Sequence, residues 1–261
     1  MTILSQSLSA AALYFRAPDK TLRPADPNQQ HLPVLQGRKY LGQFCYVPHG
    51  LEPCQDSTFY SVGAIQGLTK DPASEAALQR WEQRVGVQEA ERIRNEAIAA
   101  GKAAHALLHS YVTGEVPPPV SSRFEPYFQA LEKVLPNYEP SILSEQMVVS
   151  FTHRYYGVID QLSSYKGKLT LSDLKTSSKA KTSLDWVQDK ILQLAAYYLP
   201  IELLYPVEQA ALIYLVGDGT CDEFVFSPVQ MEIYKHEWLE RLARFRKLEK
   251  NRFLPELAES A

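Results

Sequence analysis

The sequence of 261 residues is poor in cysteine, with only three, and it has no long apolar run. Cys45, Cys54 and Cys221 cannot supply the four thiolates of an iron–sulfur cluster, and an odd number argues against a disulfide framework. The longest apolar stretches, 143–151 and 210–216, fall well short of the ~20 residues that a membrane-spanning helix needs. We therefore expect a protein of a reducing compartment that has no membrane partner.

An excess of one charge sign is also absent, because 27 basic residues stand against 30 acidic ones and the net charge is −3. This balance excludes a protein that coats nucleic acid through its global charge, but it leaves room for a local basic groove.

Cys45, His49 and Cys54 are one ligand short of a structural zinc site and too widely spaced for one. The first sixteen residues hold one basic residue and no sustained apolar core. We predict no signal peptide and a cytoplasmic protein.

The apolar fraction of 45% and the charged fraction of 22% are those of a globular chain. Prolines divide it into an irregular, proline-rich N-terminal arm, 1–58, and a single folded domain, 59–261. Within that domain we expect a helical region at 59–140, a catalytic sheet and helix at 141–228 and a basic C-terminal helix at 229–261. The prolines that predict the arm are Pro18, Pro24, Pro27, Pro33, Pro48 and Pro53.

Residue periodicity predicts the order of helices and strands. A helical pattern over 74–111, which Asp71 or Ser74 caps and Gly86 and Gly101 divide, precedes a further helix over 124–135. Three strands over 145–151, 155–164 and 168–176 follow, then a helix over 183–199 stopped by Pro200, two strands over 210–216 and 223–226, and a helix over 229–253. This order indicates an α/β fold whose central mixed sheet, antiparallel for the most part, is flanked by helices.

Two aspartates on neighbouring strands carry the chemistry. If Lys166 and Gly167 form the two-residue turn of a hairpin, Asp160 lies directly opposite Asp173, with Cβ atoms roughly 5 Å apart. Facing carboxylates repel each other unless a cation lies between them, and Mg²⁺ or Mn²⁺ prefers such oxygen ligands. Lys175 shares a face with Asp173, where its ammonium would orient a water, take its proton or stabilise a phosphate. The backbone carbonyl of Leu174 would add another oxygen ligand.

These residues occur together with others in a specific order. The series is His105, Glu145, Gly157-x-x-Asp160, Asp173-x-Lys175-Thr176 and Gln193-x-x-x-Tyr197. It resembles the motifs of the RecB-type branch of the PD-(D/E)XK nucleases, which have a restriction-endonuclease-like core. A second series lies upstream: Tyr60-Ser61-Val62, Thr69-Lys70, Trp81, Arg84-Val85-Gly86, Glu89-Ala90, Gly101 and His105. With it, the chain between about Tyr60 and Tyr198 also looks like the stand-alone exonucleases of cyanophages and cyanobacteria, which are similar to the mitochondrial genome maintenance exonuclease.

The resemblance implies a metal-dependent DNA exonuclease that acts chiefly on single strands. Asp160 and Asp173 would bind the metal, Lys175 would be the catalytic lysine, and His105 and Glu145 would assist the metal site. Gln193 and Tyr197, one helical turn apart, would support the site or touch DNA. We also assign substrate contact to residues at or just beyond the end of the third strand, namely Thr176, Ser177, Lys179 and Lys181.

Several alternatives stay open. Seven basic residues against three acidic ones over 235–252 fit either a solvated helix face or a surface that steers DNA. Tyr155, Tyr156 and Trp186 are candidates for stacking on unpaired bases. The helices over 74–111 suggest an arch that would require a free DNA end. A non-catalytic single-strand-binding module and a structure-specific endonuclease are the competing functions. We expect a monomer that acts on single-stranded DNA, with replication or repair proteins as further partners.

Overall fold

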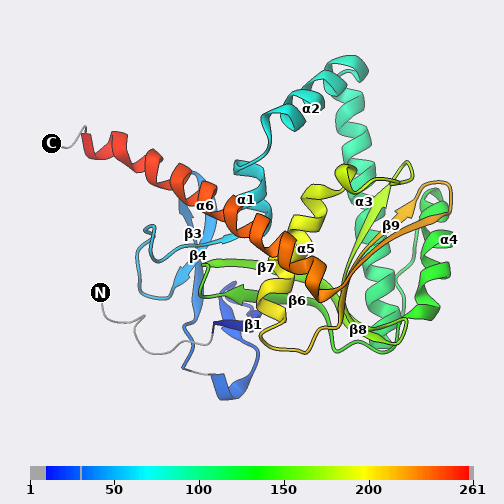
Figure 1. Ribbon diagram of the computed structural model, residues 1–261, viewed down its shortest axis with the longest axis horizontal. Helices are drawn as coiled ribbons and strands as arrows, with labels where there is room; N and C mark the ends of the chain where they lie inside the picture. Colours follow the sequence, from blue (N-terminus) through cyan, green and yellow to red (C-terminus); the bar gives the residue numbers. More distant parts are fainter. Residues whose placement is uncertain (1–9, 30, 259–261) are drawn as a thin grey trace.

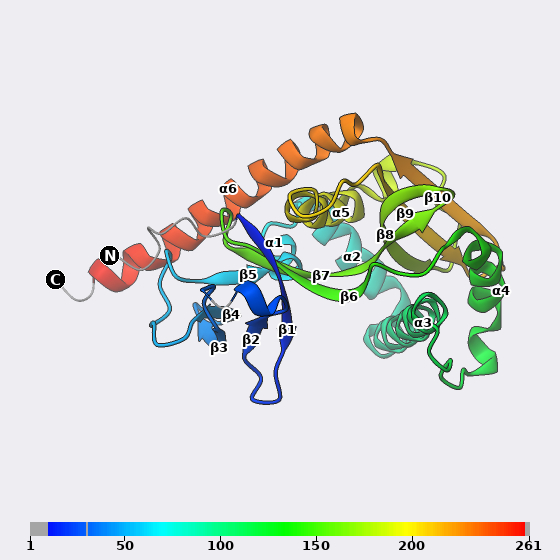
Figure 2. The same ribbon diagram turned by 90° about the horizontal axis from the view of Figure 1, so that it is seen from below.

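The computed structural model describes residues 10–29 and 31–258, with side chains described up to residue 251. Ten strands form one mixed sheet, and helices flank it on both faces (Figures 1 and 2). The strands are β1 (Ala11–Arg16), β2 (Leu22–Pro24), β3 (Leu35–Tyr40), β4 (Gln43–Pro48), β5 (Phe59–Ser61), β6 (Leu143–Ser150), β7 (Tyr155–Tyr165), β8 (Lys168–Ser177), β9 (Gln209–Val216) and β10 (Cys221–Phe226).

The α-helices of the described chain are α1 (Val62–Leu68), α2 (Pro72–Val85), α3 (Val87–Thr113), α4 (Glu125–Val134), α5 (Gln188–Ile201) and α6 (Pro228–Ala258). One face of the sheet packs on α1, α5 and α6 in a core that includes Ile65, Leu194 and Trp238. The other face packs on α3 and α4, with Leu108 and Leu131 in its core. No helix within 10–29 or 31–258 combines the length and apolar character that crossing a membrane requires.

The prediction of an irregular N-terminal arm is wrong, because residues 11–48 contribute β1 to β4. The prolines delimit these strands instead of preventing them: Pro24 and Pro48 are the last residues of β2 and β4, and Pro33 precedes β3. β6 pairs with both β1 and β7, so the strands from β1 to β7 close into a ring. Tyr14, Leu22 and other large side chains fill this ring as a separate core.

The predicted hairpin is confirmed. Lys166 and Gly167 both have positive φ, 53° and 77°, as a two-residue turn between right-twisted strands requires. The register pairs Tyr165 with Lys168 and continues to Gln161 and Ser172, as predicted. β8 also pairs in parallel with β9, which places Asp173 beside Leu212 and Lys175 beside Tyr214.

Three predicted helix boundaries differ from the structure. Gly86, with φ 87°, separates α2 from α3 as expected, and Asp71 caps α2. Gly101, however, lies inside α3 and does not end the helix, and a Cβ there would make only an ordinary contact of 3.7 Å with Thr176 Oγ1. Pro200 lies in the last turn of α5, and that helix starts at Gln188 instead of Ser183, because 184–186 form a short 3₁₀ turn.

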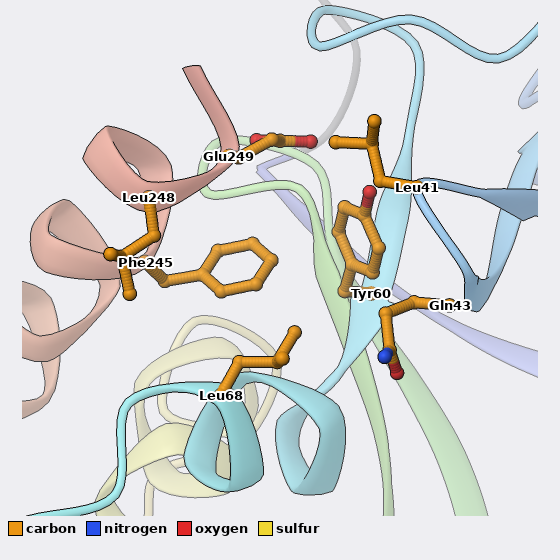
Figure 3. A pocket seen from close by; sticks show the side chains of 7 residues that line it. All are labelled: Leu41, Gln43, Tyr60, Leu68, Phe245, Leu248 and Glu249. Atoms are coloured by element: carbon orange, nitrogen blue, oxygen red, sulfur yellow. The ribbon is translucent and has the colours of Figure 1, made fainter. Parts of the chain in front are cut away.

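Helix α2 buries none of its residues and projects from the body together with the start of α3 (Figure 1). An ion pair between Arg94 and Glu82, 2.7 Å, joins the two helices. Near the start of α2, α6 packs against α1, β4 and β5 around a cavity of about 140 Å³ (Figure 3). Phe245 and Tyr60 meet edge to face across it, with ring centroids 5.0 Å apart. None of the predicted site residues lines this cavity.

Helix α5 lies so close to β7 that only glycine fits beneath Tyr197. A Cβ on Gly157 would lie 2.2 Å from Tyr197 Cε1 and 2.9 Å from Cδ1, well inside van der Waals contact. Tyr197 is buried, so its ring cannot turn out into solvent without leaving the core. The Gly157–Tyr197 contact therefore fixes the distance between α5 and the centre of the sheet.

We predict that Gly157→Ala destabilises the protein by about 1–3 kcal/mol, the usual cost of overpacking a core. Gly63→Ala is the matched control, since a Cβ there meets nothing within 4 Å and the position lies on a helix. The measurement is chemical denaturation of the two variants beside the parent. An equal free energy of unfolding for Gly157→Ala and the parent would contradict the close packing.

Candidate active site

The candidate site lies where one edge of β7 has no neighbouring strand. β6 runs along the opposite edge from Tyr155 to Leu162. On the free edge, β5 pairs only as far as Tyr156 and β8 only from Gln161 onward. Residues 157–160 are therefore left between two strands that diverge, and we call this stretch the β7 gap. Backbone groups at such a gap are available to side chains and ligands, because no ladder uses them.

Asp160 lies at the end of the β7 gap, just beyond the last paired residues of β7 and β8. Its Oδ2 accepts a hydrogen bond of 2.7 Å from the backbone N–H of Leu174, a donor that β7 would otherwise satisfy. Asp160 and Asp173 thus occupy the positions that the predicted register sets opposite each other, at the point where the ladder stops. The separation of the strands gives both carboxylates room to face one space.

His105 of α3 reaches the same space from the other side of the sheet. Its Nδ1 lies 3.2 Å from Glu145 Oε1 and 3.5 Å from Asp160 Oδ1, while its Nε2 lies 3.0 Å from the Leu174 carbonyl oxygen. A carbonyl can only accept, so Nε2 carries the proton. In a neutral ring Nδ1 would then turn a lone pair toward two carboxylates. A proton or a metal ion on Nδ1 removes that repulsion.

Glu145 has an unusual backbone conformation for a strand residue, with φ 49°. Ser144 pairs with Gln161 and Gln146 with Ile159, so Glu145 is the residue opposite Asp160, and the pairing is interrupted there. A left-handed conformation is costly for a residue with a Cβ and is concentrated at functional sites. Here it coincides with a half-exposed carboxylate held beside His105 and Asp160.

Asp173 and Lys175 form a close ion pair, with 2.6 Å between Oδ2 and Nζ. The Asp173 side chain is 2% exposed, and within the described chain its oxygens accept no well-aligned hydrogen bond from any other group. Burial disfavours the Lys175 ammonium, but Asp173 and Asp160 outweigh that effect and raise its pKa. Lys175 therefore stays charged at neutral pH, which favours stabilisation of negative charge over acceptance of a proton.

Burial and the nearby Asp173 raise the pKa of Asp160 to about 7, although Lys175, His105 and the Leu174 N–H act in the opposite direction. Burial also works against a charged His105, yet Glu145 and Asp160 outweigh it and raise the pKa of the imidazole. The site is thus rich in negative charge and holds protons near neutral pH. Perturbed groups of this kind are typical of sites that bind a cation.

The donors fit a divalent metal ion. Among the described residues, His105, Glu145 and Asp160 each offer one ligand atom, and these atoms lie within 4.8 Å of one another. Carboxylate oxygens suit Mg²⁺ and Mn²⁺, and the imidazole nitrogen is well suited to Mn²⁺. Asp173 is not one of this group, and the Leu174 carbonyl already accepts a hydrogen bond from His105. Their predicted roles as ligands stay predictions.

Gln193 and Tyr197 act as a pair on the face of α5 that covers the β7 gap. Gln193 Nε2 donates to the Tyr197 hydroxyl at 3.1 Å, and the Tyr197 ring lies over Gly157. The Gln193 Oε1 is buried without a hydrogen-bond partner in the described structure. The pair packs over the β7 gap, and its predicted contact with DNA stays a prediction.

The other predicted substrate contacts lie further from the cluster. Thr176 and Ser177 line a separate recess with Ala97 of α3 and Tyr127 of α4. Lys179 and Lys181 belong to the loop after β8, where the backbone N–H of Lys181 donates to Asp222 Oδ2 at 2.6 Å. The structure therefore does not bring these four residues to His105, and their contact with substrate stays a prediction.

Sequence reasoning missed residues that share helix faces with the predicted ones. Lys102 and His109 line a depression of about 560 Å³ with His105 and Glu145, and His109 Nδ1 lies 2.8 Å from Ser144 Oγ. The i, i+4 spacing of the two histidines was the available signal. Lys190 precedes Gln193 by one turn; burial and Lys175 lower its pKa, which indicates that its ammonium lies near the site.

Three curated proteins resemble this chain. The mouse (Mus musculus) protein named Mitochondrial genome maintenance exonuclease 1 is 25% identical over 222 residues, which cover 79% of this chain and 64% of that protein. The human (Homo sapiens) protein of the same name is 25% identical over 223 residues, with the same coverage. The Xenopus tropicalis protein is 25% identical over 249 residues, 89% of this chain and 70% of that protein. The chain thus spans 64% of its mouse and human relatives, and this weak homology supports an exonuclease family.

No protein-family model matches the chain. Among solved structures, the crystal structure of SSO0001 aligns with a TM-score of 0.39 and 15% identity, over 77% of this chain and 79% of that one. A likeness at this level carries no argument about the fold or the site. The description of the site therefore depends on its own geometry.

We predict that Mn²⁺ binds more tightly as the pH rises to about 7 and that its affinity levels off above that value. Below its pKa of about 7 Asp160 holds a proton that the ion must displace, and the raised pKa of His105 acts in the same direction. The affinity should fall by up to about tenfold per pH unit on the acid side.

Calorimetric titration with Mn²⁺ at pH 6 and pH 8, in two buffers of different ionisation enthalpy, measures both the affinity and the protons released. Asp160→Asn should bind weakly and release fewer protons, keeping only the part of the pH dependence that His105 contributes. Asp185→Asn, which changes an exposed aspartate, should behave as the parent protein. A parent affinity that is the same at both pH values, with no proton release, would show that Asp160 is not a ligand.

Proposed function

We propose that the protein is a metal-dependent deoxyribonuclease of the PD-(D/E)XK type, an exonuclease that hydrolyses single-stranded DNA. The observation that carries the proposal is the meeting of His105, Glu145 and Asp160 beside the Asp173–Lys175 pair at the β7 gap. The exonuclease names of the mouse, human and Xenopus proteins support the same activity. Replication, repair or phage DNA processing is the setting we propose for it, within the cytoplasm and as a monomer.

The residues present suit phosphodiester hydrolysis. A divalent ion, when bound, would lower the pKa of a water and neutralise charge on the phosphate. Asp160 and Glu145 would hold that ion, with His105 as a nitrogen donor and Asp173 at the opposite wall. The charged Lys175 would stabilise the phosphorane-like transition state as water oxygen bonds to phosphorus and the bond to the 3′ oxygen breaks. Gln193, with its free amide oxygen, would orient the water or a sugar.

The projecting α2–α3 pair supports a preference for single strands. Helix α2 and the start of α3 stand away from the body, joined at Gly86 and braced by the Arg94–Glu82 ion pair (Figure 1). Helix α3 also carries His105, which lies in the site. A helical pair that arches over the site would admit a single strand more easily than a duplex. Thr176, Ser177, Lys179 and Lys181 would contact the strand as it passes the end of β8.

We predict that the protein degrades end-labelled single-stranded DNA in Mg²⁺ or Mn²⁺, that EDTA abolishes the activity, and that duplex DNA is cut more slowly. Asp173→Ala should lower the rate by at least about 10³-fold, because it removes a buried carboxylate and the partner of Lys175. Asp185→Ala is the matched control and should keep full activity. Gel analysis of the labelled products over time gives the rates and the product lengths.

The same experiment separates the alternatives. If neither the parent nor Asp173→Ala cuts any strand, but both retard DNA on a native gel, the protein is a binding module and the proposal fails. If a duplex with a flap or a loop is cut internally while plain single strands survive, the activity is that of a structure-specific endonuclease. Cleavage that EDTA leaves unchanged would contradict the metal site.

We further predict that closed circular single-stranded DNA survives under conditions that degrade the same strand in linear form. An arch formed by α2 and α3 would have to be threaded by a free end, which a circle lacks. The two substrates differ only in one ligated bond, so the linear strand is its own control. Rapid cutting of the circle would show that no free end is needed.

A further inference from the structure

A tryptophan in the loop between β8 and α5, two elements that carry site residues, is exposed to solvent. Trp186 is 63% exposed, whereas Trp238 is fully buried in the core. A tryptophan side chain carries the largest apolar surface of any residue, and leaving it in water forgoes most of the free energy that its burial would supply. Leu184, two residues earlier, is also 44% exposed. An exposed apolar pair on an otherwise polar loop indicates a surface that a ligand covers.

The turn that carries Trp186 is held rigidly. The backbone N–H of Trp186 donates to the Ser183 carbonyl at 3.2 Å, and that of Val187 donates to Leu184 at 3.0 Å. Ser183 Oγ caps the turn, and the side chain of Val187, directly after Trp186, is buried in the main core. A rigid turn presents its aromatic ring at little conformational cost to a ligand.

Trp186 lies between two elements of the site along the chain. β8 ends just after the Asp173–Lys175 pair, and α5, which carries Gln193 and Tyr197, starts just after the turn. Figure 1 shows the short turn at the start of α5, on the side from which α2 and α3 project. Lys179 and Lys181 belong to the same loop. A strand that reached Lys175 from this side would pass the indole ring.

The other aromatic candidates for base stacking are excluded by their burial. Tyr155 is 1% exposed, and its hydroxyl donates to the Ala196 carbonyl at 2.8 Å. Tyr156 is 8% exposed and packs edge to face on Tyr46. Neither ring has a face open to a base. Of the three aromatic residues that the sequence nominates for stacking, Trp186 alone is accessible.

We propose that the indole of Trp186 stacks on a base of the single-stranded nucleic acid held at the site, and so positions the strand next to Lys175. This inference rests on the proposed function, since it names how that substrate is held. Stacking on an aromatic ring is independent of sequence, because every base offers a flat face. The lysines of the same loop would meet the phosphates, and the ring would meet the bases.

The test is an equilibrium binding titration with a fluorescein-labelled single-stranded oligonucleotide, in EDTA, where no cleavage can occur. Trp186→Ala should weaken binding by roughly 5- to 150-fold, the range measured for loss of one stacked base. Trp186→Phe, which keeps an aromatic face, should stay within about threefold of the parent. Leu203→Ala, which shortens an exposed apolar side chain beyond the other end of α5, is the matched control and should bind as the parent does. Thermal unfolding of the variants checks that each is folded.

An oligonucleotide of abasic sugars makes the test specific to stacking. It keeps the phosphates but offers no base, so the parent and Trp186→Ala should bind it equally. If both variants bind the normal oligonucleotide as tightly as the parent, or if Trp186→Ala loses affinity for the abasic strand as well, stacking is wrong while the nuclease proposal stands. If the parent cuts no DNA and binds none, the nuclease proposal and this inference fall together.

Discussion

The site depends on the separation of β8 from β7 after Gln161 and Ser172. If the ladder continued, the backbone N–H of Leu174 would be used by β7, and Asp160 and Asp173 would be fixed as a repelling pair on a closed sheet. Because the strands part, Leu174 instead donates to Asp160, and its carbonyl accepts from His105. Leu174 thus binds two site residues, Asp160 and His105, through its main chain. A substitution of the Leu174 side chain would leave both of these hydrogen-bonding groups in place.

Charge compensation explains why so many ionisable groups can share this space. Asp173 is almost fully buried and is neutralised by Lys175, while Asp160 and Glu145 share His105. Even so, burial and the nearby Asp173 keep the pKa of Asp160 raised, so Lys175 and His105 do not fully compensate its charged form. The uncompensated negative charge of such a site favours the binding of a cation. The packed helices around the site hold its acidic side chains in this arrangement.

The sequence predicts the site better than it predicts the surrounding fold. The Lys166–Gly167 turn fixes the hairpin register, so the meeting of Asp160 with Asp173 and Lys175 follows from local rules. The prediction that His105 and Glu145 share the site comes from the family resemblance, because no local rule relates positions 40 residues apart in sequence. The ring of β1 to β7 was missed because prolines that end strands look like prolines that break them. The left-handed Glu145 could not be predicted either, as its conformation is imposed by its neighbours in space.

The ring of strands also has a consequence for how the chain folds. β6, which carries Glu145, completes its pairing on one edge with β1, and the paired residues Ala11 and Ser150 lie far apart in sequence. Contacts of such high sequence separation close late, because the entropy of a long loop opposes them. β1 can pair with β2 as soon as both exist, but more than half of the chain must be present before β1 meets β6. The pairing of β6 with β1 is therefore expected among the later steps of folding, so the edge of the strand that carries Glu145 is completed late.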